Sequence, residues 1–248
     1  MSLADALVEL QELTEQLRRE CPWDREQTAR TIVPHTVEEA YEVAEAAYAD
    51  DDAKLLDEIG DLLFQSYFLA LLLQERGTGD LEAAARGVHT KLVARHPHVF
   101  GDAEAKTAER VRERWEELKR EQEGREGVFH DVPEVLPALL YARKVQQRAK
   151  TVGFEYPDLT GAVADLDDEI RELKEDFSAN ELGDVLFAVV NVARKLDVDP
   201  ELELRAAAKR FRGRVEAAEA IAATDGKDWT KLPLEEQDAY YDQAKERA

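Results

Sequence analysis

EEAYEVAEAAYADDDAKLLDEIGD, residues 38–61, predicts two helices joined by a sharp turn. The three aspartates at 50–52 are typical of a helix end followed by the N-cap of a new helix. Two carboxylate pairs, each with a spacing of three residues, flank the turn: Glu39 with Glu42, and Glu58 with Asp61. Side chains three apart share one face of a helix. Because the pairs are nested about residue 50, a hairpin that turns there would place Glu39 opposite Asp61 and Glu42 opposite Glu58.

Four like charges at one level between two helices would repel one another, and burial would raise their pKa values. A hard divalent cation resolves the conflict, and an oxygen-only ligand set suits Mg²⁺ or Mn²⁺. The simpler alternative is a solvated acidic face, which is how most charge runs occur. Glu39 has a further alternative role, because a helix beginning with Thr36 as N-cap would make Glu39 the partner in a capping box.

The same arrangement recurs in the second half of the chain. ELGDVLFA at 181–188 matches EIGDLLFQ at 58–65 in five of eight positions, and four carboxylates lie at the matching places: Glu169, Glu172, Glu181 and Asp184. The two pairs are separated by eight residues here and by 15 in the first copy. The difference of seven is close to two helical turns of about 3.6 residues, so both pairs stay on the inner faces. A solvated surface does not require such spacing, and the duplication therefore favours a metal site in each half.

The composition limits the class of protein. A chain of 248 residues forms one large domain or two small ones and can bury a core without added staples. The formal net charge of −22 argues against binding a nucleic-acid polymer, where basic side chains neutralise phosphates. Cys21 is the only cysteine, which excludes an intramolecular disulfide and fits a reducing, cytoplasmic location. The acidic N-terminus is unlike a signal peptide, and the longest apolar run, 67–73, is too short to span a membrane.

Apolar residues recur at helical spacing along most of the chain, so the predicted fold class is all-α. The expected helices are 3–20, 36–49, 52–76, 81–96, 107–123, 134–150, 160–176, 178–196, 200–223 and 234–247. LLFQSYFLALLL, within 52–76, is apolar nearly all round and is expected to be buried between repeats or between subunits. Glycines and a proline in 121–133 are typical of a linker. The predicted division is a repeat over 1–123, a linker over 124–133 and a second repeat over 134–248.

Several aromatic and basic residues are candidates for binding a ligand. In the loop CPWDREQT at 21–28, Trp23 could stack on a planar ligand and Asp24 could hydrogen-bond to it; the alternative is a hydrophobic plug with a helix-capping aspartate. Pairs four residues apart occur on four predicted helices: Lys91 with Arg95, Trp115 with Lys119, Arg210 with Arg214, and Tyr241 with Lys245. The alternative for the basic pairs is a solvated helix face. Beside a carboxylate-bound Mg²⁺, basic side chains would form a polyphosphate site.

The motif content narrows the chemistry further. The chain has no GxxxxGK[ST] loop, which excludes a P-loop NTPase. It has no ExxH, which disfavours the di-iron carboxylate bundles. No paired Ser/His/Asp spacing or reactive-cysteine context is visible, so water is the expected nucleophile.

Taken together, these motifs resemble those of the MazG family of nucleoside triphosphate pyrophosphohydrolases. The resemblance rests on EExxE…KLLxExGD, CPWDREQT, KLxxRHPHVF and the second copy, and it covers nearly the whole chain. It implies a tandem repeat of two MazG-like four-helix-bundle units, assembled by dimerisation, as in the wider group of all-α NTP pyrophosphatases. It also implies Mg²⁺-dependent hydrolysis of an NTP or dNTP between its α and β phosphates, giving the monophosphate and pyrophosphate.

The resemblance assigns roles to individual residues. The metal sets are Glu39, Glu42, Glu58 and Asp61 in the first repeat, and Glu169, Glu172, Glu181 and Asp184 in the second. The phosphate-binding residues of the first repeat are Lys54, Lys91, Arg95 and Lys119, with Trp115 near the nucleotide. The matching residues of the second repeat are Arg210, Arg214, Lys245 and Tyr241. Glu38 is the candidate base for water, and its counterpart is Asp168.

The second repeat departs from the family pattern. Its hairpin is shorter, Phe177 stands where the first repeat has Lys54, and Arg210 stands where it has Lys91. Arginine is not equivalent to lysine, which is a compact point charge. The first repeat is therefore expected to carry most of the turnover.

Two other functions are compatible with the sequence. The first keeps the fold but narrows the substrate to dUTP, a modified nucleotide or a ppGpp-like alarmone. The second is a non-catalytic helical scaffold with solvated acidic faces. The scaffold predicts no Mg²⁺-dependent thermal shift, because only a bound ligand stabilises the folded state.

Overall fold

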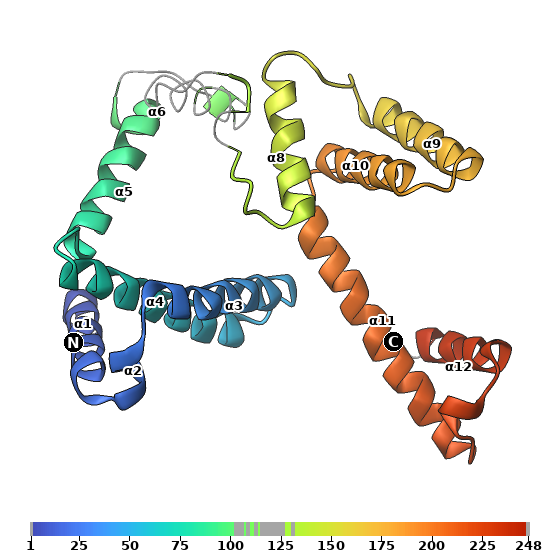
Figure 1. The fold of residues 1–248 in the computed structure, drawn as a ribbon, viewed down its shortest axis with the longest axis horizontal. Coiled ribbons are helices and arrows are strands. Elements are labelled where there is room, and N and C mark those ends of the chain that lie inside the picture. The colour runs from blue at the N-terminus through green and yellow to red at the C-terminus, as the bar shows by residue number, and fades with distance from the viewer. Residues whose placement is uncertain are drawn as a thin grey trace. The chain divides into compact units, whose positions relative to one another are not determined.

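The computed structural model describes residues 2–101, 107, 110–111, 114, 127–129 and 132–246. Within these residues the chain forms helices, turns and loops but no strand, which confirms the all-α prediction (Figure 1). The chain divides into two compact units, Met1–Gly124 and Arg125–Ala248. Most of the helix expected over 107–123 and most of the stretch 121–133 lie outside the described residues. In the described part of the chain, no helix combines the length and the apolar character needed to cross a bilayer.

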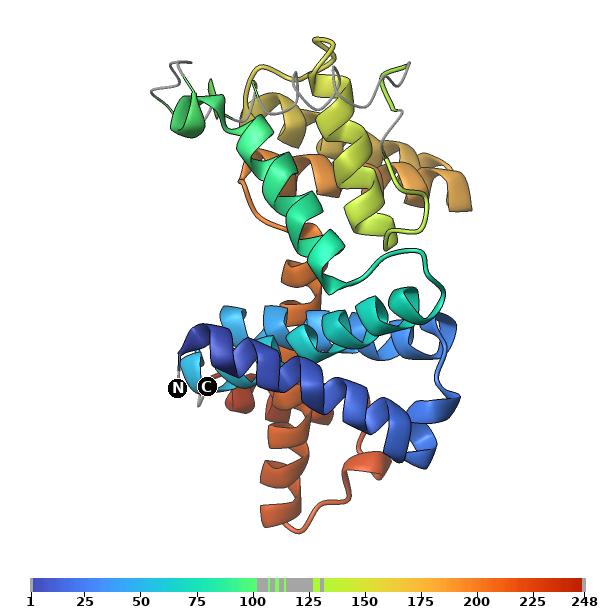
Figure 2. The ribbon, with the colours of Figure 1, turned by 90° about the vertical axis from the view of Figure 1, so that its left-hand side faces the viewer.

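The first unit is built around a hairpin of two long helices. Its elements are α1 (Leu3–Glu20), α2 (Pro22–Glu26), α3 (Ala29–Tyr48), α4 (Asp52–Glu75), α5 (Leu81–Arg95) and α6 (Pro97–Phe100). α3 and α4 pack along each other, and α1 lies against α4 (Figure 2). Ile32, Phe68 and Leu72 form the buried core between α3 and α4.

The turn between α3 and α4 occurs where the sequence predicts it. Asp50 adopts a left-handed conformation with φ of 51°, which aspartate tolerates better than most residues. Asp51 is the N-cap of α4, and its carboxylate accepts a hydrogen bond from the backbone N–H of Lys54 at 3.0 Å. The aspartates therefore end one helix and start the next.

The start of α3 differs from the prediction. The helix begins at Ala29, and the hydroxyl of Thr28 accepts a hydrogen bond from the N–H of Thr31. Thr36 lies inside the helix and donates its hydroxyl to the carbonyl of Ile32 at 3.3 Å. The prediction of Thr36 as N-cap was wrong because the Thr28 cap starts the helix early enough to enclose Pro34, which costs one intrahelical hydrogen bond. Glu39 therefore has no capping role.

The second unit contains a shorter hairpin and a long helix. Its elements are α8 (Ala138–Lys150), α9 (Leu159–Glu175), α10 (Ala179–Lys195), α11 (Pro200–Thr224), the 3₁₀ turn η1 (Trp229–Lys231) and α12 (Leu234–Glu246). α9 and α10 form the hairpin, and Gln146 of α8 donates to the carbonyl of Phe187 in α10 at 2.8 Å. α12 packs along α11 around Ala218 and Tyr240.

A charged network ties the segment before α9 to α10. Glu155 binds Arg194 through both carboxylate oxygens, at 2.6 and 2.8 Å, and binds Lys195 at 2.7 Å. All three side chains are mostly buried, with exposed fractions of 16%, 10% and 13%. The hydrogen bonds from Arg194 are the main cause that lowers the pKa of Glu155 to about 2.

This low pKa predicts how stability depends on pH. The pKa of Glu155 is lower in the folded state than its ordinary value of 4.5. Its contribution to the free energy of unfolding is therefore fully present above pH 4.5 and is lost as the pH falls toward 2. The shift corresponds to about 3 kcal/mol. Glu155→Gln is therefore expected to lower the free energy of unfolding of the second unit by up to that amount at pH 7 and to flatten its pH dependence between 5 and 2. Urea denaturation followed by circular dichroism measures both. Glu175→Gln, which removes an exposed carboxylate of the same unit, is the control, and an equal effect of the two substitutions would contradict the prediction.

Candidate metal centre

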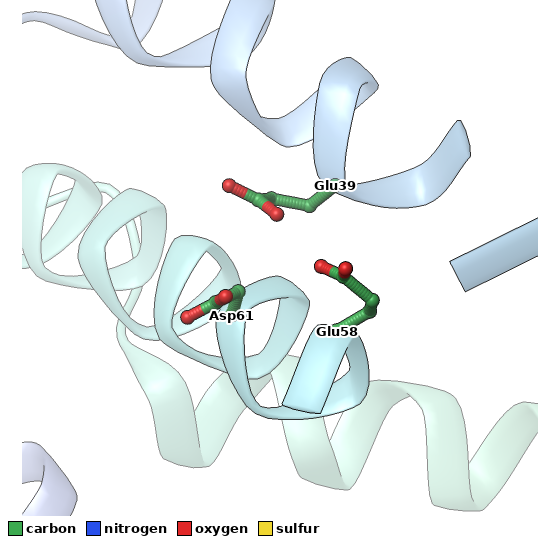
Figure 3. Close-up of side chains that lie close together, drawn as sticks. All are labelled: Glu39, Glu58 and Asp61. Atoms are coloured by element: carbon green, nitrogen blue, oxygen red, sulfur yellow. The ribbon is translucent and has the colours of Figure 1, made fainter. Parts of the chain in front are cut away.

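The α3/α4 hairpin brings carboxylates from both helices together. Glu39 extends from α3 toward Glu58 and Asp61 of α4 (Figure 3). One oxygen from each of the three carboxylates lies within 4.8 Å of the others. Glu58 is buried with 8% of its surface exposed, Glu39 is partly buried and Asp61 is exposed. The cluster is thus accessible to solvent at Asp61 and shielded from it at Glu58.

The charges in this cluster oppose one another. Burial raises the pKa of Glu39, and the nearby charges of Asp61, Glu42 and Glu58 raise it further. Burial also raises the pKa of Glu58, followed by the charge of Glu42. Glu42 therefore belongs to the same group of acids, although it lies outside the set of three whose oxygens are mutually closest. Carboxylates with raised pKa values and several free oxygens fit a hard divalent cation.

Two further predicted residues border the cluster. Lys54 lies one turn before Glu58 on α4, and its Nζ is 3.8 Å from Glu58 Oε1. This positive charge partly offsets the repulsion, since it lowers the pKa of Glu58. Glu38, next to Glu39 on α3, is mostly exposed, and its Oε2 lies 3.7 Å from Nδ1 of His35. Both residues are accessible to a ligand that binds over the carboxylates.

The α9/α10 hairpin forms a second cluster from the corresponding residues. One oxygen each of Glu169, Glu172 and Glu181 lies within 4.8 Å of the others. Burial raises the pKa of Glu169, and so do the charges of Glu172, Asp184 and Asp165. Asp184 lies outside the closest three and accepts a hydrogen bond from the Asn180 amide at 3.2 Å.

The second cluster differs from the first in its surroundings. Phe177, at the position that matches Lys54, leaves 85% of its surface exposed and supplies no positive charge. Asp165 adds a carboxylate one helical turn before Glu169. Asp168, the counterpart of Glu38, pairs with Arg171 at 2.8 Å. The second cluster therefore has Asp165 as a further neighbouring carboxylate and no lysine at the position of Lys54 to offset the negative charge.

The predicted phosphate-binding residues of the first unit are not all brought to the cluster. Glu58 lies 17 residues before the end of α4, or about 25 Å along its axis at 1.5 Å per residue. α5 starts beyond that end and leads away from the hairpin (Figure 1). Lys91 is exposed and Arg95 is buried on the C-terminal half of α5. Neither residue belongs to the group of acids and bases that the contacts place around Glu39 and Glu58. Trp115 and Lys119 lie outside the described residues.

In the second unit the predicted ligands gather on α11 and α12. Nζ of Lys245 lies 4.9 Å from the centre of the Tyr241 ring and 2.9 Å from Asp242. The hydrogen bond from Lys245 to Asp242 raises the Lys245 pKa, whereas the neighbouring charge of Arg214 lowers it. Arg210 is exposed on α11. α12 packs on α11, and Figure 1 shows it away from the α9/α10 hairpin.

The CPWDREQT segment forms the short helix α2 rather than a loop. Trp23 leaves 53% of its surface exposed, so it is no hydrophobic plug within this chain, whereas Asp24 is buried. The Trp23 ring meets the His35 ring edge-on, with centroids 5.9 Å apart and planes at 67°. His35 was not among the predicted residues, although its position four residues before Glu39 places it on the same side of a helix. Phe211, whose ring lies 5.7 Å from that of Tyr241, was not predicted either.

Comparison with known proteins identifies the family. The profile of the MazG nucleotide pyrophosphohydrolase domain matches residues 27–100. The nucleoside triphosphate pyrophosphohydrolase/pyrophosphatase MazG of Thermotoga maritima is 37% identical over 96% of this chain and 94% of its own length. The nucleoside triphosphate pyrophosphohydrolase of Escherichia coli K12 is 37% identical over 99% of this chain and 98% of its own length.

A solved structure gives a further match. The crystal structure of a mazG-related protein from Thermotoga maritima is 33% identical and covers 45% of this chain and 97% of that one, with a TM-score of 0.40. The two full-length relatives span both units of the chain, and the matched domain contains the whole α3/α4 hairpin. The chain belongs to the MazG family of nucleotide pyrophosphohydrolases.

Proposed function

We propose that this chain hydrolyses nucleoside triphosphates between the α and β phosphates, releasing a nucleoside monophosphate and pyrophosphate. The observation that carries the proposal is the acidic cluster of Glu39, Glu58 and Asp61, whose oxygens converge within 4.8 Å with Glu42 beside them. Relatives that share 37% of their residues over nearly their full length bear the name of this activity.

Mg²⁺ is the proposed cofactor, with Mn²⁺ as a chemically similar substitute. Glu39, Glu42, Glu58 and Asp61 would hold it in the first unit, and Glu169, Glu172, Glu181 and Asp184 in the second. When bound, the ion supplies positive charge to the phosphate oxygens and promotes ionisation of water. The raised pKa values of Glu39 and Glu58 fit this assignment, because a bound cation would offset both causes that raise them, namely burial and the repulsion between neighbouring carboxylates.

The remaining residues of the first unit act on substrate and water. Lys54 lies against Glu58 at the edge of the cluster, where its ammonium group can meet a phosphate oxygen. Glu38 is exposed beside the cluster and is the proposed acceptor of the proton from water. Trp23 and Asp24 are proposed to hold the nucleoside. The residues proposed to complete the site of the first unit are Lys91, Arg95, Lys119 and Trp115. Those proposed to complete the site of the second unit are Arg210, Arg214, Lys245 and Tyr241.

We further propose that the active form is a homodimer. Lys91 and Arg95 lie on α5, which leads away from the α3/α4 hairpin in Figure 1, so a second copy is the proposed source of these contacts. The α3/α4 hairpin also leaves apolar side chains exposed, among them Leu56 at 74% and Ile59 at 48%. An apolar helix face of this kind gains free energy when a second copy covers it.

The proposed organisation is two MazG-like repeats, 1–123 and 134–248, joined by a linker over 124–133. A cytoplasmic location fits the single cysteine. The net charge of −22 supports a nucleotide held through a cation rather than a nucleic-acid polymer. The second candidate function is a pyrophosphohydrolase with a narrow preference for dUTP, a modified nucleotide or an alarmone. Comparing the turnover of a panel of nucleotides distinguishes it from an enzyme that accepts many NTPs.

The products of hydrolysis test the proposal directly. Purified protein incubated with ATP or dTTP and Mg²⁺ is expected to release the monophosphate and pyrophosphate, resolved by ion-exchange chromatography. Diphosphate and orthophosphate would contradict the proposed bond cleavage. No hydrolysis, together with no Mg²⁺-dependent rise in melting temperature, would favour the helical scaffold.

A further inference from the structure

His35 contacts two residues that have separate proposed tasks. Its ring meets the indole of Trp23 edge-on at 5.9 Å, and its Nδ1 lies 3.7 Å from Oε2 of Glu38. Trp23 is proposed to hold the nucleoside, and Glu38 is proposed to accept a proton from water. The His35 imidazole therefore lies between the residue proposed to hold the nucleoside and the residue proposed to activate water.

The position of His35 relative to the acidic cluster follows from α3. His35 precedes Glu39 by four residues, so both side chains lie on one side of the helix, about one turn or 5.4 Å apart. The Trp23/His35 pair thus borders the carboxylates at the N-terminal end of α3. A triphosphate bound over the carboxylates with its nucleoside directed toward this pair would meet the exposed ring of Trp23.

The backbone that carries Trp23 is held firmly. Arg18 donates from Nη1 to the carbonyls of Asp24, at 2.5 Å, and Gln27, at 3.0 Å. The side-chain amide of Gln27 donates to the carbonyl of Trp23 at 2.9 Å. Half of the Trp23 surface is nevertheless exposed. An aromatic ring that is exposed on a fixed backbone can stack on a planar ligand with little loss of conformational entropy.

We propose that His35 is a positioning residue of this site, which holds the Trp23 ring for stacking on the nucleobase and orients Glu38 toward water. The inference rests on the proposed function and adds to it one residue that links recognition of the base to activation of water. The described residues of the second unit have a different arrangement at the matching position. Asp165 occupies the place of His35 and accepts a hydrogen bond from the Tyr156 hydroxyl at 2.7 Å.

Two substitutions separate the two contacts of His35. His35→Phe keeps an aromatic ring against Trp23 but removes the nitrogen that faces Glu38. His35→Gln keeps a polar group near Glu38 but removes the ring. Because an aromatic pair contributes about 0.5–1.5 kcal/mol, His35→Gln is expected to raise the KM for ATP about 2- to 10-fold with kcat unchanged. His35→Phe is expected to lower kcat about 10-fold with KM unchanged, since a general base typically contributes at least 100-fold when fully removed.

Inorganic triphosphate distinguishes base recognition from phosphate binding. As a competitive inhibitor it has no base to stack, so its Ki is expected to stay the same in His35→Gln and in wild type. His89→Gln and His89→Phe, at an exposed histidine of α5, are the matched controls and are expected to leave both constants unchanged.

The inference is overturned if both His35 variants change KM and kcat together, if neither changes either constant by 2-fold, or if Ki for inorganic triphosphate rises with KM. Melting temperatures near the wild-type value exclude loss of folding as the cause. Failure of the proposed function looks different, because wild type would then release no monophosphate and pyrophosphate from ATP.

Discussion

Glu58→Gln is expected to lower kcat for NTP hydrolysis by at least about 100-fold, because a cation in such a site contributes several kcal/mol to stabilising the transition state. The substitution keeps the size of a side chain of which only 10% is exposed. It also removes one of the charges that repel one another in the metal-free cluster. The melting temperature without Mg²⁺ is therefore expected to stay the same or to rise, while the Mg²⁺-dependent increase is lost.

Glu181→Gln is the matched control, because Glu181 holds the corresponding position in the second cluster. The second cluster lacks the lysine that faces Glu58 and carries the additional charge of Asp165. Most of the turnover is therefore expected to survive in Glu181→Gln. Steady-state kinetics on both variants measure the difference. Full activity in Glu58→Gln together with its loss in Glu181→Gln would assign the turnover to the second unit instead.

Arg18→Met is expected to lower the free energy of unfolding of the first unit by about 1–3 kcal/mol, because it removes the mostly buried guanidinium that donates to two part-buried backbone carbonyls. Arg18 is 17% exposed, binds both oxygens of Glu75 at 2.7 and 2.8 Å, and also donates to the carbonyls of Asp24 and Gln27. Methionine keeps packing over the Phe68 ring, which the guanidinium faces at 5.9 Å, but it removes the side-chain donor to the Gln27 carbonyl. The Asp24 carbonyl keeps its hydrogen bond from the Gln27 N–H at 3.2 Å.

Arg19 provides the control for Arg18 from the next position on the same helix. Its side chain is 63% exposed, and its nitrogen lies 3.8 Å from Glu15. Exposed pairs of this kind contribute little, so Arg19→Met is expected to change the free energy of unfolding by about 0.5 kcal/mol or less. Arg18→Lys is expected to lie between the two, because lysine cannot bind a carboxylate through two parallel hydrogen bonds. Urea denaturation compares the three variants, and equal values for Arg18→Met and Arg19→Met would contradict the role of Arg18.

The carboxylate clusters could be predicted from sequence because their geometry is local. The helical period fixes which side chains share a face, and the aspartates at 50–52 fix where the chain reverses. Glu39, Glu58 and Asp61 converge as the spacing predicts. The start of α3 was missed because Pro34, which interrupts the periodic pattern, is tolerated inside the helix.

The rest of the site depends on packing that the sequence pattern does not encode. The contact between Trp23 and His35 requires the fold of α2 back toward α3, which the Arg18 hydrogen bonds hold in place. Lys91 and Arg95 have the predicted spacing on α5, but spacing on one helix gives no information about which other helix they face. For the same reason, the pairing of Tyr241 with Phe211 across α11 and α12 was not foreseen.

The α3/α4 hairpin has a consequence for how such proteins diversify. Its converging acids are separated by at most 22 positions, from Glu39 to Asp61, so closing the loop between them costs little entropy. A segment of this length contains all four carboxylates, so duplication of the segment also duplicates the proposed metal ligands. Changes in hairpin length are then tolerated when they amount to whole turns, as the difference of seven residues between the two repeats does, whereas a shift of half a turn would separate the acids.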